Sequence, residues 1–116
     1  MYPYSEIIAA AESAGPARPA IDREGLRAAA GRGELAELLA ELRDDARRTD
    51  PLPELPYRLF RTYIHSGDRG QYEGRYFERR RRLNSAALIA LIDGGAENLE
   101  RLLDILWTIC DEYSWA

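Results

Sequence analysis

Apolar side chains recur every three or four positions along most of the chain, which is the spacing of one face of an α-helix. The clearest case is the set Leu35, Leu38, Leu39, Leu42 and Ala46, which predicts an amphipathic helix from about residue 34 to residue 48. Five further segments show the same periodicity. We expect these helices at about residues 4–14, 22–30, 57–65, 71–92 and 97–113.

Capping and helix-breaking residues set the limits of these helices. Asp22 stands where an N-terminal cap is expected, and the Gly-Gly pair at 94–95 is typical of a left-handed helix stop. Three prolines within residues 50–56 remove backbone donors and restrict the residues before them, so this segment cannot be a continuous helix. We expect it to be extended, with Leu52 and Leu55 packed onto the body.

The two longest predicted helices, 71–92 and 97–113, are joined by a tight turn and predict an antiparallel hairpin. Charge supports this pairing. Residues 58–82 hold eight arginines and three acids, whereas residues 93–116 hold six acids and one arginine. The sequence therefore predicts an all-α fold built from helical hairpins, with N-terminal helices in residues 1–50 and a hairpin region in residues 51–116.

Composition agrees with a helical protein. Among 116 residues there are 17 alanines, 15 leucines and three threonines but no valine, a balance that favours helices over strands. No apolar run approaches the ~20 residues that a membrane span needs, and the N-terminus lacks the pattern of a signal peptide. The single cysteine, Cys110, can form neither an internal disulfide nor a cysteine-based zinc site. We expect a cytoplasmic protein without membrane contact.

The run from Arg79 to Arg82 is the first candidate for a binding surface. Four consecutive residues spread around a helix, so they cannot form a single patch. The apolar stripe predicted for this helix places Arg80 toward the core or a cleft. That stripe consists of Tyr72, Tyr76, Leu83, Ala87, Ala90 and Leu91.

Two interpretations of these arginines remain open. In the first, Arg75, Arg79 and Arg82 share a solvated face, and Arg80 pairs internally with Asp111 or Glu112. In the second, arginine and tyrosine side chains form a wall that binds an anionic sugar by guanidinium forks and ring stacking. The residues of that wall are Tyr72, Arg75, Tyr76, Arg79 and Arg80. Nucleic acid is a weaker option, because an acidic segment opposes the basic one.

No other residue pattern predicts catalysis. His65 is the only histidine, near a helix C-terminus where the helix dipole favours its cationic form. It has no second metal ligand and no nucleophilic partner at a diagnostic spacing. Gly67 and Gly70 have neither the strand nor the Gly-Lys-Ser element of a phosphate-binding loop. We expect no catalytic residue, no metal site and no cofactor in this chain.

Three groups of residues in the second half of the chain carry a family resemblance. The first comprises Tyr57-Arg58-Leu59-Phe60, Thr62 and Gly67-Asp68-Arg69. The second comprises Tyr72-Glu73 and Tyr76-Phe77-Glu78-Arg79-Arg80. The third is Ile105-Leu106-Trp107-Thr108-Ile109-Cys110-Asp111-Glu112, followed by Trp115. In order and spacing, residues 52–116 resemble the N-terminal region of heparinase II/III-like proteins, whereas residues 1–51 match only as generic helices.

The resemblance implies the first helices of an incomplete (α/α) toroid in a polysaccharide lyase. Such enzymes act by β-elimination on uronic-acid sugars: a base removes the C5 proton while another group neutralises the carboxylate. The Tyr, His and Asn residues that serve this chemistry in the family lie further along the toroid, and no position here matches them. We therefore expect a non-catalytic scaffold that contacts an anionic polysaccharide as the N-terminal part of a longer protein.

A rival interpretation is a free-standing helical interaction module that uses Trp107, Tyr113 and Trp115 as its partner surface. The last predicted helix also carries a broad apolar face that a single hairpin cannot cover. A two-fold symmetric contact between copies would cover it. We therefore expect a homo-oligomer that forms through the last two helices.

Overall fold

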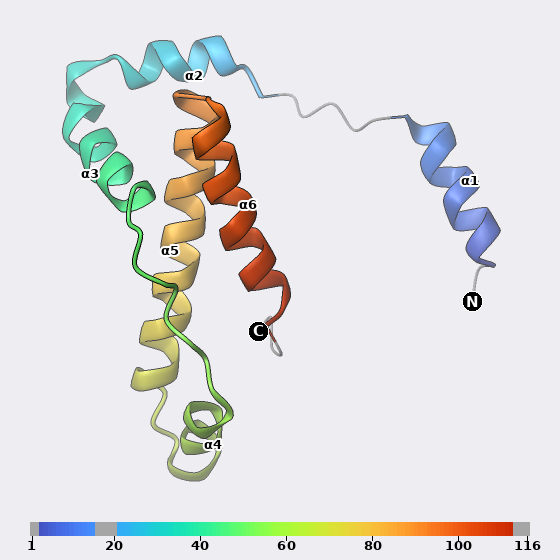
Figure 1. Cartoon of the computed structure of the whole chain (residues 1–116), viewed down its shortest axis with the longest axis vertical. Helices are drawn as coiled ribbons and strands as arrows, with labels where there is room; N and C mark the ends of the chain where they lie inside the picture. The colour runs from blue at the N-terminus through green and yellow to red at the C-terminus, as the bar shows by residue number, and fades with distance from the viewer. Residues whose placement is uncertain (1–2, 16–20, 113–116) are drawn as a thin grey trace.

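A computed structural model describes residues 3–15 and 21–112, and all regular structure in these residues is helical (Figure 1). The predicted all-α fold class is confirmed, whereas the toroid stays a prediction. The elements are α1 (Tyr4–Ala14), α2 (Arg23–Ala30), a 3₁₀ turn (Gly33–Leu35), α3 (Ala36–Ala46), α4 (Tyr57–Ser66), α5 (Gly70–Ile92) and α6 (Ala96–Cys110). Linker residues 16–20, and Tyr113 and Trp115 of the predicted partner surface, lie outside the described residues.

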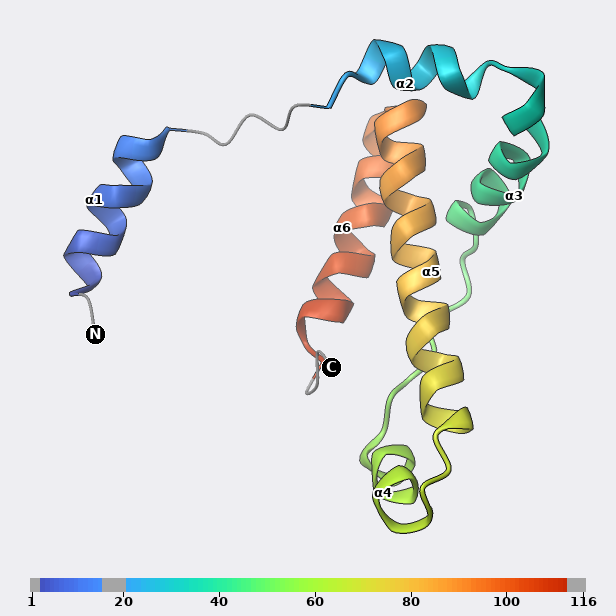
Figure 2. The ribbon, with the colours of Figure 1, turned by 180° about the vertical axis from the view of Figure 1, so that it is seen from behind.

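Helices α5 and α6 form the predicted antiparallel hairpin, and α3 packs along the other side of α5 (Figures 1 and 2). The hairpin turns at Gly94 and Gly95, whose φ angles of 71° and 88° are left-handed values that favour glycine. The main buried cluster lies where α2, α3 and the end of α5 meet. It consists of Leu39, Ala46, Ile89 and Ile92, with Leu26, Ala30 and Leu42 packed against it.

Arginines fasten α2 and α3 to the end of α5. The Arg27 Nε donates to the carbonyl of Ile92 at 2.8 Å, which satisfies one of the free carbonyls at the helix C-terminus. Arg43 of α3 forms a bidentate pair with Asp93, with both hydrogen bonds at 2.8 Å. That pairing lowers the pKa of Asp93 through the hydrogen bond from Arg43.

The buried face of α5 differs from the predicted apolar stripe by about one helical position. The buried residues are Arg79, Arg82, Ser85, Ala86, Ile89 and Ile92, whereas Leu83, Ala87, Ala90 and Leu91 are half-buried. The prediction was wrong because it assumed that apolar side chains alone define the buried face. In α4, Leu59 is buried, whereas Tyr57 and Ile64 are exposed.

Helix α1 stands apart from the rest of the molecule (Figures 1 and 2). It has no buried residue, although its limits agree with those predicted. The radius of gyration is 18.4 Å. A compact chain of this length has about 13 Å. The separation of α1 is the main reason for the open shape.

Candidate functional site

One face of α5 holds the extended segment 50–56, which we call the proline-rich segment. Arg75 donates to the carbonyl of Glu54 at 3.2 Å, and Arg79 donates to that of Pro53 at 2.8 Å. Arg82 reaches the carbonyls of Pro51 and Arg48 at 3.3 and 3.4 Å. These three arginines, the arginine face, share one side of the helix as predicted, but Arg79 and Arg82 are buried and not solvated. They supply donors to a segment that has no helix or sheet partner.

Glu112 joins the arginine face to the end of α6. Its carboxylate accepts from Arg79 Nε at 2.5 Å and from both terminal nitrogens of Arg80, at 3.1 and 2.5 Å. The exposed fraction of the Glu112 side chain is 3%. Burial alone would raise the pKa of Glu112, but the hydrogen bonds from Arg80 and Arg79 outweigh it and lower that pKa below its ordinary value. The predicted pairing of Arg80 with Glu112 is confirmed, and the more deeply buried partner is Arg79.

The guanidinium groups nearby are also engaged by acids. Arg48 pairs with Asp50 at 2.7 Å and with Glu78 at 2.6 Å. The hydrogen bond from Arg48 lowers the pKa of Asp50 to about 2. Among the described residues, only Arg82 Nε is a buried side-chain polar atom without a hydrogen-bond partner. The arginine run is therefore mainly an internal network.

A buried polar pair beside this network was not predicted. The Ser85 hydroxyl, which is 1% exposed, donates to Asp45 at 2.8 Å. Asp45 also forms an ion pair with Arg81, in which Oδ1 of Asp45 lies 3.1 Å from a terminal nitrogen of Arg81. A buried carboxylate of α3 therefore faces α5. In the sequence, the one feature that could have indicated this pair is that Ser85 and Asp45 each fall on an otherwise apolar face of their helix.

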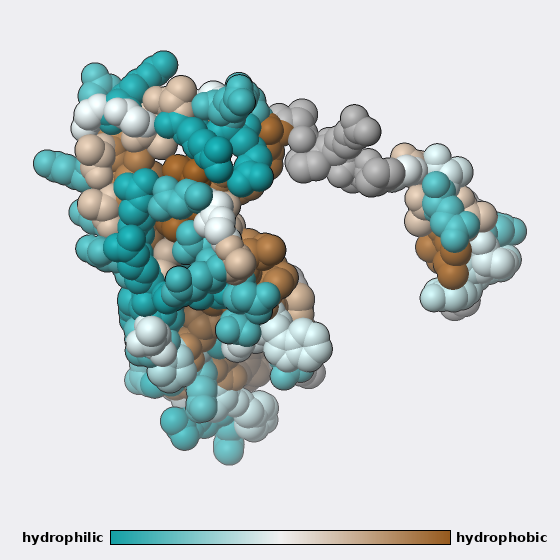
Figure 3. Space-filling view, turned by 45° about the horizontal axis from the view of Figure 1, so that its top comes forward, coloured by the Kyte–Doolittle hydropathy of each residue, from teal (hydrophilic) through white to brown (hydrophobic). Residues whose placement is uncertain are grey.

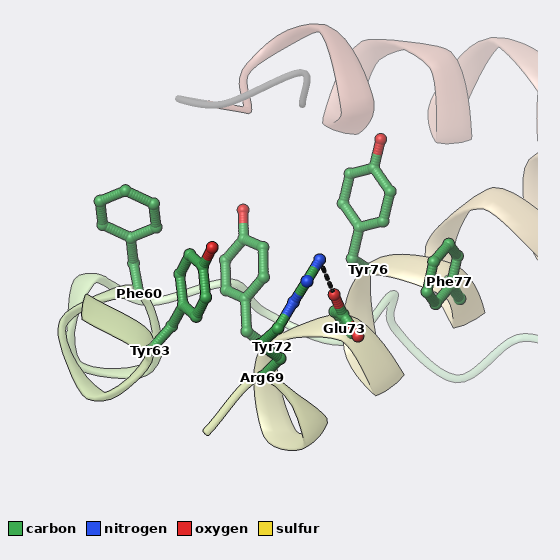
Figure 4. Close-up of a pocket in the computed structure, with 7 residues that line it drawn as sticks. All are labelled: Phe60, Tyr63, Arg69, Tyr72, Glu73, Tyr76 and Phe77. Carbon is green, nitrogen blue, oxygen red and sulfur yellow. Dashed lines mark ion pairs between the residues drawn. The ribbon is translucent and has the colours of Figure 1, made fainter. Parts of the chain in front are cut away.

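An aromatic cleft lies where α4 meets the first turns of α5 (Figure 4). Its volume is about 310 Å3. It is lined by Phe60, Tyr63, Arg69, Tyr72, Glu73, Tyr76 and Phe77. The spacing of four residues between Tyr72 and Tyr76 places their rings on one side of α5, nearly parallel at 16° with centroids 6.3 Å apart. Phe60 meets Tyr72 edge-on at 6.0 Å.

Two cations are fixed against the rings of the aromatic cleft. Arg69 lies 5.6 Å from the Tyr63 ring centre and pairs with Glu73 at 2.6 Å (Figure 4). Arg80 lies over Tyr76 at 4.4 Å, while its terminal nitrogens hold Glu112. The rings are thus pre-oriented, and the charge of each cation is balanced by an acid.

A second cavity, of about 750 Å3, adjoins the aromatic cleft through Phe60 and Tyr72. We call it the interhelix cavity, because it lies between the proline-rich segment, α4, α5 and the end of α6. Its lining residues are Glu54, Leu55, Pro56, Tyr57, Phe60, Tyr72, Arg79, Thr108, Asp111 and Glu112. Three acids against one arginine make its wall acidic. A cavity of this size can hold a small ligand or sugar unit.

The structure divides the five residues predicted to form one wall. Tyr72 and Tyr76 line the aromatic cleft, and Arg80 lies behind the Tyr76 ring. Arg75 and Arg79 line a third cavity beside the proline-rich segment, and Arg79 also lines the interhelix cavity together with Tyr72. Sequence reasoning missed the cleft residues Phe60, Tyr63, Arg69, Glu73 and Phe77. The available signal was the repeat of Tyr72-Glu73 and Tyr76-Phe77 at a spacing of four.

Glu112 is held ionised by its arginines, so it is a poor proton donor, and His65 lies in the last turn of α4, outside both cavities. Within residues 3–15 and 21–112, no cluster of three or more potential metal-binding side chains occurs. None of the helices in the same ranges combines the length and hydropathy needed to cross a bilayer.

Comparison of the chain with protein-family models, with curated proteins and with solved structures yields no match.

Proposed function

We propose that this chain is the N-terminal helical segment of a heparinase II/III-like protein, a polysaccharide lyase that acts by β-elimination on uronic-acid sugars. The segment is a scaffold that contributes one sugar-binding wall and no catalytic group. The resemblance of residues 52–116 to that family is the starting point of the proposal.

The observation that carries the proposal is the convergence of the three residue groups of the resemblance on one cavity. Tyr57 and Phe60 come from the first group, Tyr72 and Arg79 from the second, and Thr108, Asp111 and Glu112 from the third. These residues are up to 55 positions apart in the sequence, yet all line the interhelix cavity. Because residues of all three groups line the same cavity, we interpret the resemblance as a common site and not as a chance likeness.

The charges of the site indicate how a sugar would be held. The aromatic cleft contains one ion pair and no excess cation, and the wall of the interhelix cavity is acidic. The uronate carboxylate therefore has no unengaged guanidinium to meet here. Aromatic rings offer apolar faces to the C–H face of a pyranose ring. We expect this segment to contact sugar rings by stacking, while the carboxylate is neutralised elsewhere in the protein.

Titration of the chain with oligosaccharides, followed by NMR, tests the proposal. Uronate oligomers and a neutral oligosaccharide of equal length should both perturb the signals of Tyr72 and Tyr76. Tyr76→Ala should weaken binding, whereas Leu38→Ala changes an exposed side chain of α3 that lines neither cavity and should not. Perturbation confined to the arginines, or equal loss of binding in both variants, would contradict the stacking site.

The chain by itself should show no lyase activity on heparin, alginate or hyaluronan, because no position in it matches the catalytic Tyr, His and Asn residues of the proposed family. Ultraviolet absorbance of the unsaturated uronate product measures this directly. A rise in absorbance with the pure chain would overturn the assignment as scaffold.

A second candidate function, a helical interaction module, is supported by the outer face of α6. Trp107 is 83% exposed, and Leu99 and Leu103 are each about half exposed. Apolar surface of this kind commonly marks a contact with a partner. Light scattering tests the homo-oligomer that the sequence predicts through this face.

A further inference from the structure

The unpartnered surface of α6 is a continuous stripe. Leu99, Leu103, Leu106 and Cys110 follow one another at spacings of three and four, and Trp107 lies four residues after Leu103, so all five share one side of the helix. The first four are 50%, 48%, 37% and 83% exposed, and Cys110 is exposed as well. The opposite side of α6, with Ile109 at 2% exposure, packs on the body.

Helix α1 carries a second unpartnered stripe of matching length. Tyr4, Ile7, Ile8 and Ala11 share one side of α1, and all are exposed. The 11 residues of α1 span about 16 Å, and residues 99–110 of α6 span the same length. In the space-filling view, apolar surface is visible both over α6 and on the side of α1 turned toward the body (Figure 3).

The connection of α1 to α2 places α1 within reach of α6. Arg23, at the start of α2, donates to the carbonyl of Leu91 at 3.4 Å, so α2 begins beside the α5–α6 turn. Eight residues, 15–22, separate Ala14 from Arg23. Extended, they cover about 27 Å. This length is greater than the distance along α6 from its first residue to the middle of the exposed stripe.

We propose that α1 docks antiparallel on the exposed stripe of α6 within the same chain, and that the separated position is its open state. Because α1 is tethered beside the α5–α6 turn, its C-terminal end meets Leu99 and Tyr4 meets Cys110. A short tether gives an effective concentration in the millimolar range. At lower protein concentration, α1 therefore covers the stripe in preference to a second copy.

No charged residue lies within either stripe. The charged residues of α1 are Glu6, on its opposite side, and Glu12, which borders the stripe beside Ile8. On α6, Glu97, Arg101 and Asp104 lie off the exposed stripe by helical position, and Glu100 borders it beside Trp107. The antiparallel direction also sets the helix dipoles in opposition, which is the favourable arrangement.

Disulfide trapping tests the docked state, because Cys110 is the only cysteine and is exposed. Under mild oxidation at low micromolar concentration, Tyr4→Cys should close an intramolecular disulfide with Cys110. Ser5→Cys points off the stripe, and Ala11→Cys lies on the stripe about 10 Å further along the helix. Both controls should close at least about tenfold more slowly, since a disulfide requires close Cβ approach.

A second comparison separates docking from random collision. Adding Ile7→Asp and Ile8→Asp to the Tyr4→Cys chain should abolish closure, whereas adding Ala9→Asp, on the opposite side of α1, should preserve it. These substitutions should leave the body folded, because α1 contributes no buried residue. Circular dichroism verifies this. Equal closure rates among the three cysteine variants, or disulfides that form only between chains, would overturn the proposal.

Discussion

Two faces of the first part of α5 use side chains in opposite ways. On the arginine face, charged groups are directed inward and matched with carbonyls and carboxylates, so that Arg79 is only 5% exposed. On the other face, the rings of Tyr72 and Tyr76 join those of α4 to line an open cleft. The difference teaches that charge density in the sequence did not identify the surface that we propose for binding. Side-chain pairing did.

The arginine face behaves like a core built from polar groups. Such a core is costly to disrupt, because removing one partner leaves a buried charge unpaired. The aromatic cleft lies at the surface, where a substitution costs little stability but removes contact area for a ligand. Variants in the two regions should therefore separate into stability defects and binding defects.

The largest effect is expected for Glu112→Gln, since it leaves two guanidinium groups, Arg79 and Arg80, without their shared carboxylate. At pH 7 we expect a loss of about 3–5 kcal/mol in the free energy of unfolding. The measurement is urea denaturation of both chains. A loss within experimental error would show that the carboxylate is not an internal partner.

The same pair gives a test by pH. The pKa of Glu112 is lowered in the folded state, so its stabilisation is complete above the unfolded value of 4.5 and is lost as the pH falls through the lower folded value. The stability of the unmodified chain should therefore fall below about pH 5. The difference from Glu112→Gln should shrink over that range. A constant difference down to pH 3 would contradict the assignment.

Arg79→Ala should follow, with a loss of about 3 kcal/mol, because Arg79 holds Glu112 and two backbone carbonyls while nearly buried. Arg81→Ala is the matched control on the same helix. Its side chain is 55% exposed, and its loss should be about 1 kcal/mol or less. Chemical denaturation of the two variants under identical conditions compares them. Similar midpoints would remove the distinction between buried and surface arginines.

Arg80→Ala should be intermediate, at about 2 kcal/mol, which is typical of a lost hydrogen bond to a charged group. Its side chain is 22% exposed, and Arg79 remains to satisfy Glu112. If its thermal midpoint equals that of Arg81→Ala, the proposed internal pairing of Arg80 is wrong.

Helix positions could be predicted from the sequence better than helix faces. Local signals placed α1 at residues 4–14 and the α2 cap at Asp22, whose side chain accepts from Gly25 N at 2.9 Å. The pairing of Arg80 with Glu112 also followed from position. The burial of Arg79 could not be predicted, because two of its three partners are the carbonyls of Pro53 and Thr108, and backbone acceptors do not show in a pattern of side chains.

Only the part of the aromatic cleft that lies on α5 could be predicted from the sequence. Tyr72 and Tyr76 share a face by their spacing alone. Phe60 and Tyr63 join them only because α4 folds back against the start of α5 through the turn at Gly67, whose φ of 71° is left-handed. A turn of this type sets the direction in which the next helix leaves. That direction cannot be predicted from the spacing of apolar residues within either helix.

The smallest effect on stability is expected in the aromatic cleft. Tyr76→Ala removes a half-buried ring and its contact with Arg80, and we expect a loss of about 1 kcal/mol. Affinity for an oligosaccharide should fall by about tenfold, which corresponds to one stacking contact. Calorimetric titration measures the affinity. A larger loss of stability than in Arg79→Ala would reverse the proposed division of roles.

The central claim, that the arginines of α5 are internal and that the aromatic cleft is the surface able to bind, is tested most directly by NMR of the arginine Nε–H groups. The account predicts that Arg79 Nε–H, bound to Glu112, exchanges with solvent much more slowly than Arg58 and Arg61, both on the exposed side of α4. It also predicts that a sulfated oligosaccharide leaves the Arg79 signal in place. Fast exchange of Arg79, or a shift of its signal on addition of the sulfated sugar, would contradict the account.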